Sequence, residues 1–222
     1  MKYYGRIMGA EQAIVIIAAL ILSIILHEVA HGYAANWLGD PTARLAGRLT
    51  LNPIPHIDPL GSVIVPALLF FSSAGFLFGW AKPVPYNPYN LTNRRWGEAM
   101  VAAAGPLTNL SLAIIFAVLI RMAGTLGLPP SFVDIASYIV FINILLALFN
   151  LIPIPPLDGS KVLESILPYN LQMKYRQLTS SIERFGLLFT FAFIFIFITL
   201  LWGPFSRIIG AVFEFFTGFR IF

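Results

Sequence analysis

The chain has 222 residues, of which 58% are apolar and only 11% are charged, with 14 Lys and Arg against 10 Asp and Glu. Soluble domains carry about 25% charged and about 45–50% apolar residues, so this composition excludes a soluble globule or a disordered chain and favours a polytopic membrane protein. The basic residues are scattered singly between apolar runs, which argues against nucleic-acid binding. The absence of cysteine excludes disulfides, thiolate metal ligands and cysteine nucleophiles.

The first half of the chain is predicted to contain one spanning helix and one interrupted apolar segment. A spanning helix needs about 20 mainly apolar residues, and residues 10–38 satisfy that requirement. Residues 39–58 contain several prolines and no helical period, so we expect a loop or short strands there. Residues 60–79 are apolar but interrupted by proline, serine and glycine, and the polar, proline-rich stretch that follows cannot be a helix.

The second half is predicted to contain three more spans. They cover residues 98–125, 131–151 and 185–202. Residues 168–184 are the most polar stretch and are expected at an interface or in a loop, and the tail after residue 203 is interpreted as an interfacial helix. The predicted fold class is therefore an all-α polytopic membrane protein with about four to six membrane segments.

Three ionisable residues, His27, Glu28 and His31, fall inside the first predicted span in the pattern HEVAH. Ionisable groups at that depth cost a few kcal/mol each and are functional by default. Positions i and i+4 share one helix face, so both imidazoles can reach one Zn²⁺. Glu28 is turned about 100° away, where it can act as a general base rather than as a ligand. The short pattern also arises by chance, but the chain has only three histidines and two lie here.

Asp158 is the candidate for a third zinc ligand, because catalytic zinc usually has three protein ligands and one open position. It lies in NLIPIPPLDG, at the end of an apolar span and after prolines that break the helix. Gly159 permits a tight backbone turn next to it. The alternative is that Asp158 only caps the helix SKVLESIL, a role that Ser160 can also supply. Beside HEVAH, the ligand role is favoured.

The paired motifs HEVAH and NLIPIPPLDG resemble those of the site-2 protease family of intramembrane zinc metalloproteases, and AAAGPLTNL between them resembles the family's middle helix. The resemblance covers about residues 15–170 of a single membrane domain, 1–222, whose C-terminal helices occupy 171–222. HIDPLG and GWAKPVPYNP look like a compact prokaryotic branch without PDZ-like or CBS-like domains. The resemblance implies one Zn²⁺ per chain, held by His27, His31 and Asp158, with Glu28 as general base.

Four further polar residues are candidates for roles in or near the site, two of them through the resemblance. Asn150 matches an Asn that the family places near the scissile carbonyl, where it can donate a hydrogen bond to the developing oxyanion. The alternative is a helix-terminal Asn that satisfies freed backbone groups. Asn109 matches a polar position of the middle helix and is interpreted as a helix–helix hydrogen bond. His56 and Asp58 are candidate extra ligands, although an ordinary polar loop is favoured.

Residues 60–79 raise a parity problem, because the family's first motif helix and middle helix are adjacent and antiparallel. One true crossing between them would invert the middle helix, so we predict that this segment enters and returns or forms a broken hairpin. GWAKPVPY would then offer an extended edge near the metal, where a substrate strand can pair by β-augmentation. The orientation stays open: counting positive charges over five crossings places the N-terminus inside, and the re-entrant arrangement places it outside.

The motifs predict an intramembrane zinc metalloprotease that cleaves in or near a substrate's transmembrane helix, either in regulated intramembrane proteolysis or in clearing signal-peptide remnants. The expected partners are a transmembrane protein or peptide and the lipid bilayer, with no nucleic acid, and the expected location is a prokaryotic cell membrane. The competing class is a transporter or channel that uses the same His, Glu and Asp residues for metal or protons. Transporters often contain inverted repeats, and none is evident in this sequence.

Overall fold

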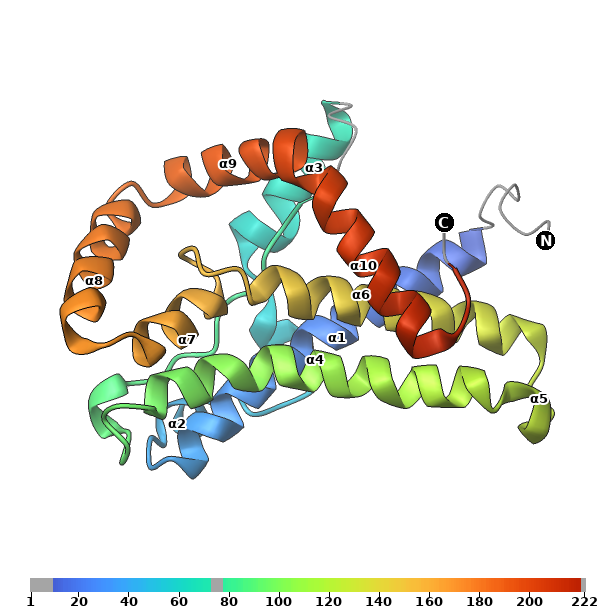
Figure 1. Cartoon of the computed structure of the whole chain (residues 1–222), viewed down its shortest axis with the longest axis horizontal. Helices are drawn as coiled ribbons and strands as arrows, with labels where there is room; N and C mark the ends of the chain where they lie inside the picture. Colours follow the sequence, from blue (N-terminus) through green and yellow to red (C-terminus); the bar gives the residue numbers. More distant parts are fainter. Residues whose placement is uncertain (1–9, 73–77, 221–222) are drawn as a thin grey trace.

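The computed structural model describes residues 10–72 and 78–220, and within those ranges the protein is helical and contains no β-strand. Among the described residues, four helices are long and apolar enough to cross a membrane: Ile14–Trp37, Gly97–Arg121, Pro130–Asn150 and Leu187–Thr217. This confirms the predicted class of an all-α membrane protein. Figure 1 shows the first three running along the long axis of the molecule.

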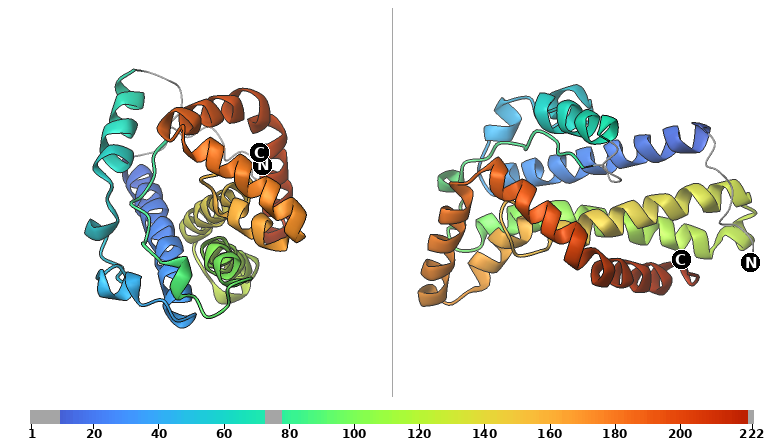
Figure 2. Two further views of the ribbon diagram at one scale, coloured as in Figure 1. Left: turned by 90° about the vertical axis from the view of Figure 1, so that its left-hand side faces the viewer. Right: turned by 90° about the horizontal axis from the view of Figure 1, so that it is seen from above.

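Three helices form the centre of the bundle: α1 (Ala10–Trp37), α4 (Gly97–Arg121) and α6 (Pro130–Asn150). Helix α4 packs against both α1 and α6, and the views in Figures 1 and 2 agree on this arrangement. Its first half is rich in buried small residues, among them Gly97, Ala102 and Gly105. Small residues let backbones approach closely in lipid, where packing replaces the hydrophobic effect as the force between helices.

Short helical elements connect α1 to α4: α2 (Thr42–Leu45), η1 (Ile54–His56), η2 (Pro59–Ile64), α3 (Val65–Phe71) and η3 (Pro88–Asn90). The helical stretch 59–71 rises about 20 Å, too little to cross a hydrocarbon core of about 30 Å. The chain then comes back to its starting point, because the Trp80 amide donates to the Gly61 carbonyl (3.1 Å) and the Lys82 amide to the His56 carbonyl (2.9 Å). The two ends of the segment therefore lie together, as the prediction of a returning segment requires; residues 73–77 lie outside the described residues.

After α6, which follows the short α5 (Ala123–Leu126), the chain forms α7 (Asp158–Ile166), α8 (Tyr169–Glu183), α9 (Leu187–Ile196), η4 (Phe197–Leu201) and α10 (Trp202–Thr217). Figure 1 shows α8 lying across one end of the bundle, roughly perpendicular to α4. This position suits the polar stretch 168–184, which was expected at an interface.

The tail, which was expected to form an interfacial helix, is a helix that packs against the bundle. Helix α10 packs against α6 and α4 and buries Phe205, Ile209 and Phe213, which lie four residues apart on one face. Arg121, at the end of α4, donates hydrogen bonds to the carbonyls of Phe215 (2.7 Å) and Phe216 (2.6 Å). The guanidinium thereby satisfies carbonyls that a helix end leaves without partners, and it ties α10 to the bundle.

Candidate metal centre

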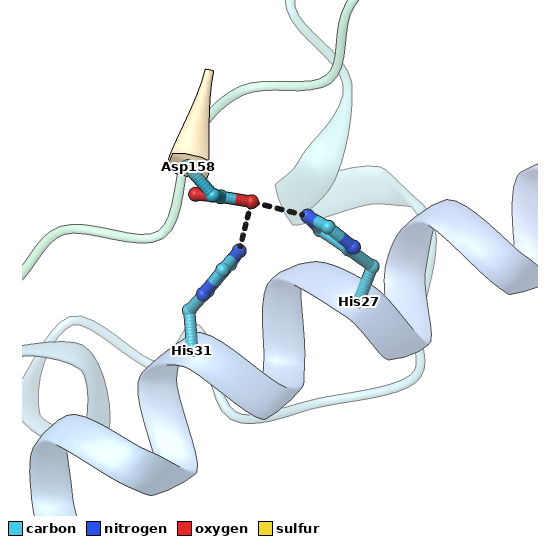
Figure 3. Close-up of side chains that lie close together, drawn as sticks. All are labelled: His27, His31 and Asp158. Atoms are coloured by element: carbon cyan, nitrogen blue, oxygen red, sulfur yellow. Dashed lines mark ion pairs between the residues drawn. The ribbon is translucent and has the colours of Figure 1, made fainter. Parts of the chain in front are cut away.

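His27, His31 and Asp158 converge on one point inside the bundle (Figure 3). The two histidines lie one turn apart on α1, and Asp158 is the first residue of α7. Asp158 Oδ2 lies 3.1 Å from Nε2 of His27 and 3.3 Å from Nε2 of His31. Within residues 10–72 and 78–220, no other group of three His, Asp or Glu side chains is close enough to hold a metal ion.

These separations suit a zinc ion. Bonds of about 2.0–2.2 Å in a tetrahedral arrangement place ligand atoms about 3.3–3.6 Å apart, and the observed spacings of 3.1 and 3.3 Å lie at or just below the short end of that range. Asp158 Oδ2 is buried without a hydrogen-bond partner. An ionised oxygen in that position is costly unless a cation compensates its charge. The donor set and the orphaned oxygen therefore fit one zinc ion.

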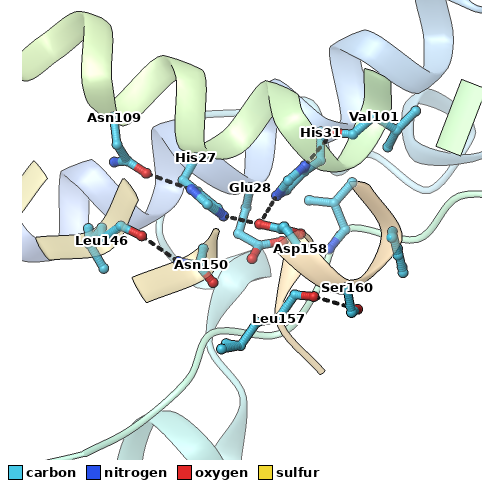
Figure 4. Close-up of polar contacts among 12 residues, drawn as sticks. His27, Glu28, His31, Val101, Asn109, Leu146, Asn150, Leu157, Asp158 and Ser160 are labelled. Atoms are coloured by element: carbon cyan, nitrogen blue, oxygen red, sulfur yellow. Dashed lines mark hydrogen bonds and ion pairs between the residues drawn. The ribbon is translucent and has the colours of Figure 1, made fainter. Parts of the chain in front are cut away.

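The second ring nitrogen of each histidine points away from this centre and is hydrogen-bonded (Figure 4). His27 Nδ1 donates to Asn109 Oδ1 at 2.6 Å, and His31 Nδ1 donates to the Val101 carbonyl at 2.7 Å. A carbonyl oxygen only accepts, so these contacts keep a proton on Nδ1, and the neutral ring then has its lone pair on Nε2. Both acceptors belong to α4, which explains why the middle helix must lie against α1.

Helix α7 aims the Asp158 carboxylate because its first turn packs closely on the end of α6. A side chain at Gly159 would collide with the carbonyl groups of Leu151 and Ile152. Gly159 is not among the residues with positive φ, so its glycine is needed for this close approach and not for the tight turn that we predicted. The capping alternative is not observed: Leu157 is the N-cap residue, and Ser160 Oγ donates to its carbonyl (2.7 Å).

Glu28 lies beside Asp158 on the next face of α1 and is not one of the three converging residues (Figure 4). Its Oε2 accepts a hydrogen bond from the Val84 amide at 2.9 Å. Val84 belongs to residues 78–87, which form no helix and run as an extended segment beside α1 (Figure 2). A backbone amide thus orients the carboxylate next to the candidate metal site.

This extended segment is held from several sides. Arg48 Nη2 donates to the Lys82 carbonyl (2.6 Å), Lys161 Nζ donates to the Tyr86 hydroxyl (2.8 Å), and the Asn87 amide donates to Asp40 (2.6 Å). Few backbone amides in this segment are free to pair with a substrate strand, which limits the predicted β-augmentation. Pro83 and Pro85 have no amide hydrogen, and the Val84 amide is already bonded to Glu28.

The remaining predicted site residues make local contacts. Asn150 Nδ2 donates to the Leu146 carbonyl of its own helix (2.9 Å), which matches the helix-terminal alternative, so its oxyanion role stays a prediction. His56 Nε2 bonds to the Thr50 carbonyl (2.9 Å), and Asp58 Oδ1 accepts from the Gly61 amide (2.7 Å) as the cap of η2. His56 and Asp58 therefore have the structural roles of an ordinary polar loop.

Sequence reasoning missed Ser23, Gly105 and Asn143. All three are buried near the histidines, and Asn143 is completely inaccessible within α6. The signal for Asn143 was available, since it is an amide in the middle of an apolar span, where polar side chains are costly and need partners. The importance of Gly105 depends on a contact with α1 that no local pattern reveals.

Comparison with known proteins agrees with this geometry. The model of peptidase family M50 matches residues 123–197. The chain is 39% identical over 175 residues to "Putative zinc metalloprotease YwhC" of Bacillus subtilis, covering 74% of each protein. It is 32% identical over 160 residues to "Putative zinc metalloprotease Rip2" of Mycolicibacterium smegmatis, covering 68% of this chain and 56% of that protein. No solved structure matches the chain.

The chain belongs to peptidase family M50, which confirms the resemblance to site-2 proteases. It is a zinc-dependent metalloendopeptidase of the membrane.

Proposed function

We propose that this protein hydrolyses a peptide bond in or near the transmembrane helix of a substrate, with His27, His31 and Asp158 holding one zinc ion and Glu28 acting as general base. The observation that carries the proposal is the convergence of three candidate ligand atoms from the spanning helix α1 and the short helix α7, with the Glu28 carboxylate beside them. Residues 1–222 act in it as one protease domain of a prokaryotic cell membrane.

Each side chain has a defined task in this proposal. Bound zinc would supply Lewis-acid chemistry that polarises the scissile carbonyl and makes water a better nucleophile. The Glu28 carboxylate accepts the proton of the attacking water and later delivers it to the nitrogen of the leaving amine. The Val84 amide keeps that carboxylate oriented. Asn150 can stabilise the oxyanion once its Nδ2 leaves the Leu146 carbonyl.

A transmembrane substrate suits the position of the centre. The ligands come from α1 and α7, and α4 closes the site from a third side. A helical substrate hides its carbonyls in backbone hydrogen bonds, so it must unwind locally before cleavage. Regulated proteolysis and clearance of signal-peptide remnants both use such a reaction. Family membership favours this hydrolase over the transporter alternative.

The proposal is tested with the purified full-length chain, a model transmembrane substrate and zinc analysis. Glu28→Gln should retain zinc and lose cleavage, whereas Asp158→Ala and His27→Ala should lose zinc. Glu214→Gln is the matched control, because Glu214 lies on α10 and pairs with Arg220 at 3.1 Å. Cleavage by Glu28→Gln at the wild-type rate would remove Glu28 from the mechanism, and full zinc content in Asp158→Ala would remove Asp158 from the metal site.

A further inference from the structure

A buried chain of hydrogen bonds joins the three central helices and ends on His27. Asn109 of α4 and Asn143 of α6 are 0% exposed, and Ser23 of α1 is 4% exposed. Asn109 Nδ2 donates to Asn143 Oδ1 at 2.8 Å, and Asn143 Nδ2 donates to Ser23 Oγ at 2.9 Å. The chain continues from Asn109 Oδ1 to His27 Nδ1 (Figure 4). Polar groups so deep in a membrane protein are costly unless they are paired.

The direction of these hydrogen bonds is set by backbone carbonyls, which only accept. Asn143 Nδ2 donates to the Ile139 carbonyl at 2.9 Å, so the Asn143 oxygen must turn towards Asn109. The Asn109 nitrogen then faces that oxygen and also the Ser23 carbonyl at 3.3 Å. Only the oxygen of Asn109 is left to face His27.

This direction decides which nitrogen of His27 is free. An accepting oxygen at Nδ1 keeps the proton there and leaves the lone pair on Nε2, which lies 3.1 Å from Asp158 Oδ2. A reversed amide would donate to Nδ1 and place the proton on Nε2, where it would block a metal. His31 faces no such choice, because its partner is the Val101 carbonyl.

We propose that Asn143 is a positioning residue, which acts through Asn109 to hold His27 in the tautomer that presents Nε2 to zinc. The inference rests on the proposed role of His27 as a zinc ligand. Partners that orient ligating histidines typically account for 10–100-fold in metal affinity, so removing the Asn143 amide should weaken zinc binding by at least about 10-fold.

The test measures zinc dissociation constants of the full chain by competition with a chelator. Asn143→Leu should weaken binding by at least about 10-fold, and Ser137→Ala should not, since Ser137 Oγ on the same helix bonds to the Val133 carbonyl of its own turn. The informative variant is Asn109→Asp, whose carboxylate presents an acceptor to His27 in either orientation. Asn143→Leu combined with Asn109→Asp should therefore recover zinc affinity. A purely structural defect of Asn143→Leu would not be rescued in this way.

Two outcomes overturn the proposal: wild-type zinc affinity in Asn143→Leu, or a loss that Asn109→Asp does not restore. If Asn143→Leu fails to fold, ¹⁵N NMR of the zinc-loaded wild-type protein decides, because only three histidines need assignment. A proton on Nδ1 of His27 with Nε2 bound to zinc supports the proposal, and the reverse rejects it. His27→Ala distinguishes failure of the proposed zinc site from failure of the proposed role of Asn143. If His27→Ala retains zinc, the metal site itself is refuted. If His27→Ala loses zinc but Asn143→Leu binds it normally, only the role of Asn143 is refuted.

Discussion

Gly105 of α4 lies against the imidazole of His31 on α1 so closely that a methyl group on Gly105 would overlap Nε2 of His31. The same methyl would lie 2.6 Å from Nε2 of His27. The absence of a side chain at this position therefore gives the Nε2 atoms of His27 and His31, the candidate zinc ligands, the room they need.

Gly105→Ala should displace the histidines and abolish stoichiometric zinc binding. Both imidazoles are anchored through Nδ1, so they cannot move aside without losing a hydrogen bond. Gly124→Ala is the matched control, because a side chain at Gly124 meets nothing within 4 Å. Zinc analysis of both purified variants checks the prediction, which fails if Gly105→Ala binds one zinc ion as tightly as Gly124→Ala.

Gly159→Ala should separate Asp158 from the histidines. The new methyl would meet backbone atoms of Leu151, which cannot rotate away as a flexible side chain would. Overpacking of this kind costs about 1–3 kcal/mol or more. We expect a lower melting temperature and a reduced zinc content. Gly203→Ala, in open space on α10, should change neither property, and equal zinc content in the two variants would contradict the proposed packing role.

Asp40 should make stability depend on pH, because it is fully buried and accepts hydrogen bonds from Thr42, Asn87 and Asn90. Burial raises the pKa of Asp40, but the hydrogen bonds together lower it by more than burial raises it. The pKa of Asp40 therefore lies below its usual value. A lowered pKa in the folded state stabilises the protein above the unfolded pKa of about 3.9. That stabilisation is lost as the pH falls through the folded pKa.

Asp40→Asn should therefore destabilise the protein at pH 7, by roughly 1.5–3 kcal/mol for hydrogen bonds to a charged group. The difference from wild type should shrink as the pH falls below about 4. Thermal unfolding of both proteins across this range measures the effect. A difference that stays constant with pH would show that the charge of Asp40 does not contribute.

Val84→Pro should slow cleavage without removing zinc, because proline lacks the amide hydrogen that Glu28 accepts. A positioned general base contributes about 10²–10⁴-fold to a rate, so we expect at least about a 10-fold loss relative to Val84→Ala. The alanine variant keeps the amide and serves as the control for the lost side chain. Equal cleavage rates in the two variants would mean that this hydrogen bond does not orient Glu28 during turnover.

The sequence alone determined what depends on composition and short-range geometry. The low charge of the chain identified a membrane protein, and the spacing of His27 and His31 placed both imidazoles on one helix face because a helix repeats every 3.6 residues. The expected antiparallel packing of the two flanking helices also predicted that the apolar segment 60–79 returns, and its two ends meet at Gly61 and Trp80. The packing of the tail could not be predicted from the sequence. An apolar stripe such as Phe205, Ile209 and Phe213 suits burial at a membrane interface as well as packing against other helices, and in the structure α10 packs against α4 and α6.

Only the tertiary structure decided which distant groups meet the histidines. Asn109 was expected to make a helix–helix hydrogen bond, but its partners, His27 and Asn143, lie on two different helices. Ser23 and Asn143 are 120 positions apart in the chain. Contacts of this range depend on how helices rotate and pack against each other, and helical periodicity does not specify that rotation. The sequence thus supplied the candidate ligands, and the packing of α1, α4 and α6 decided how His27 is held.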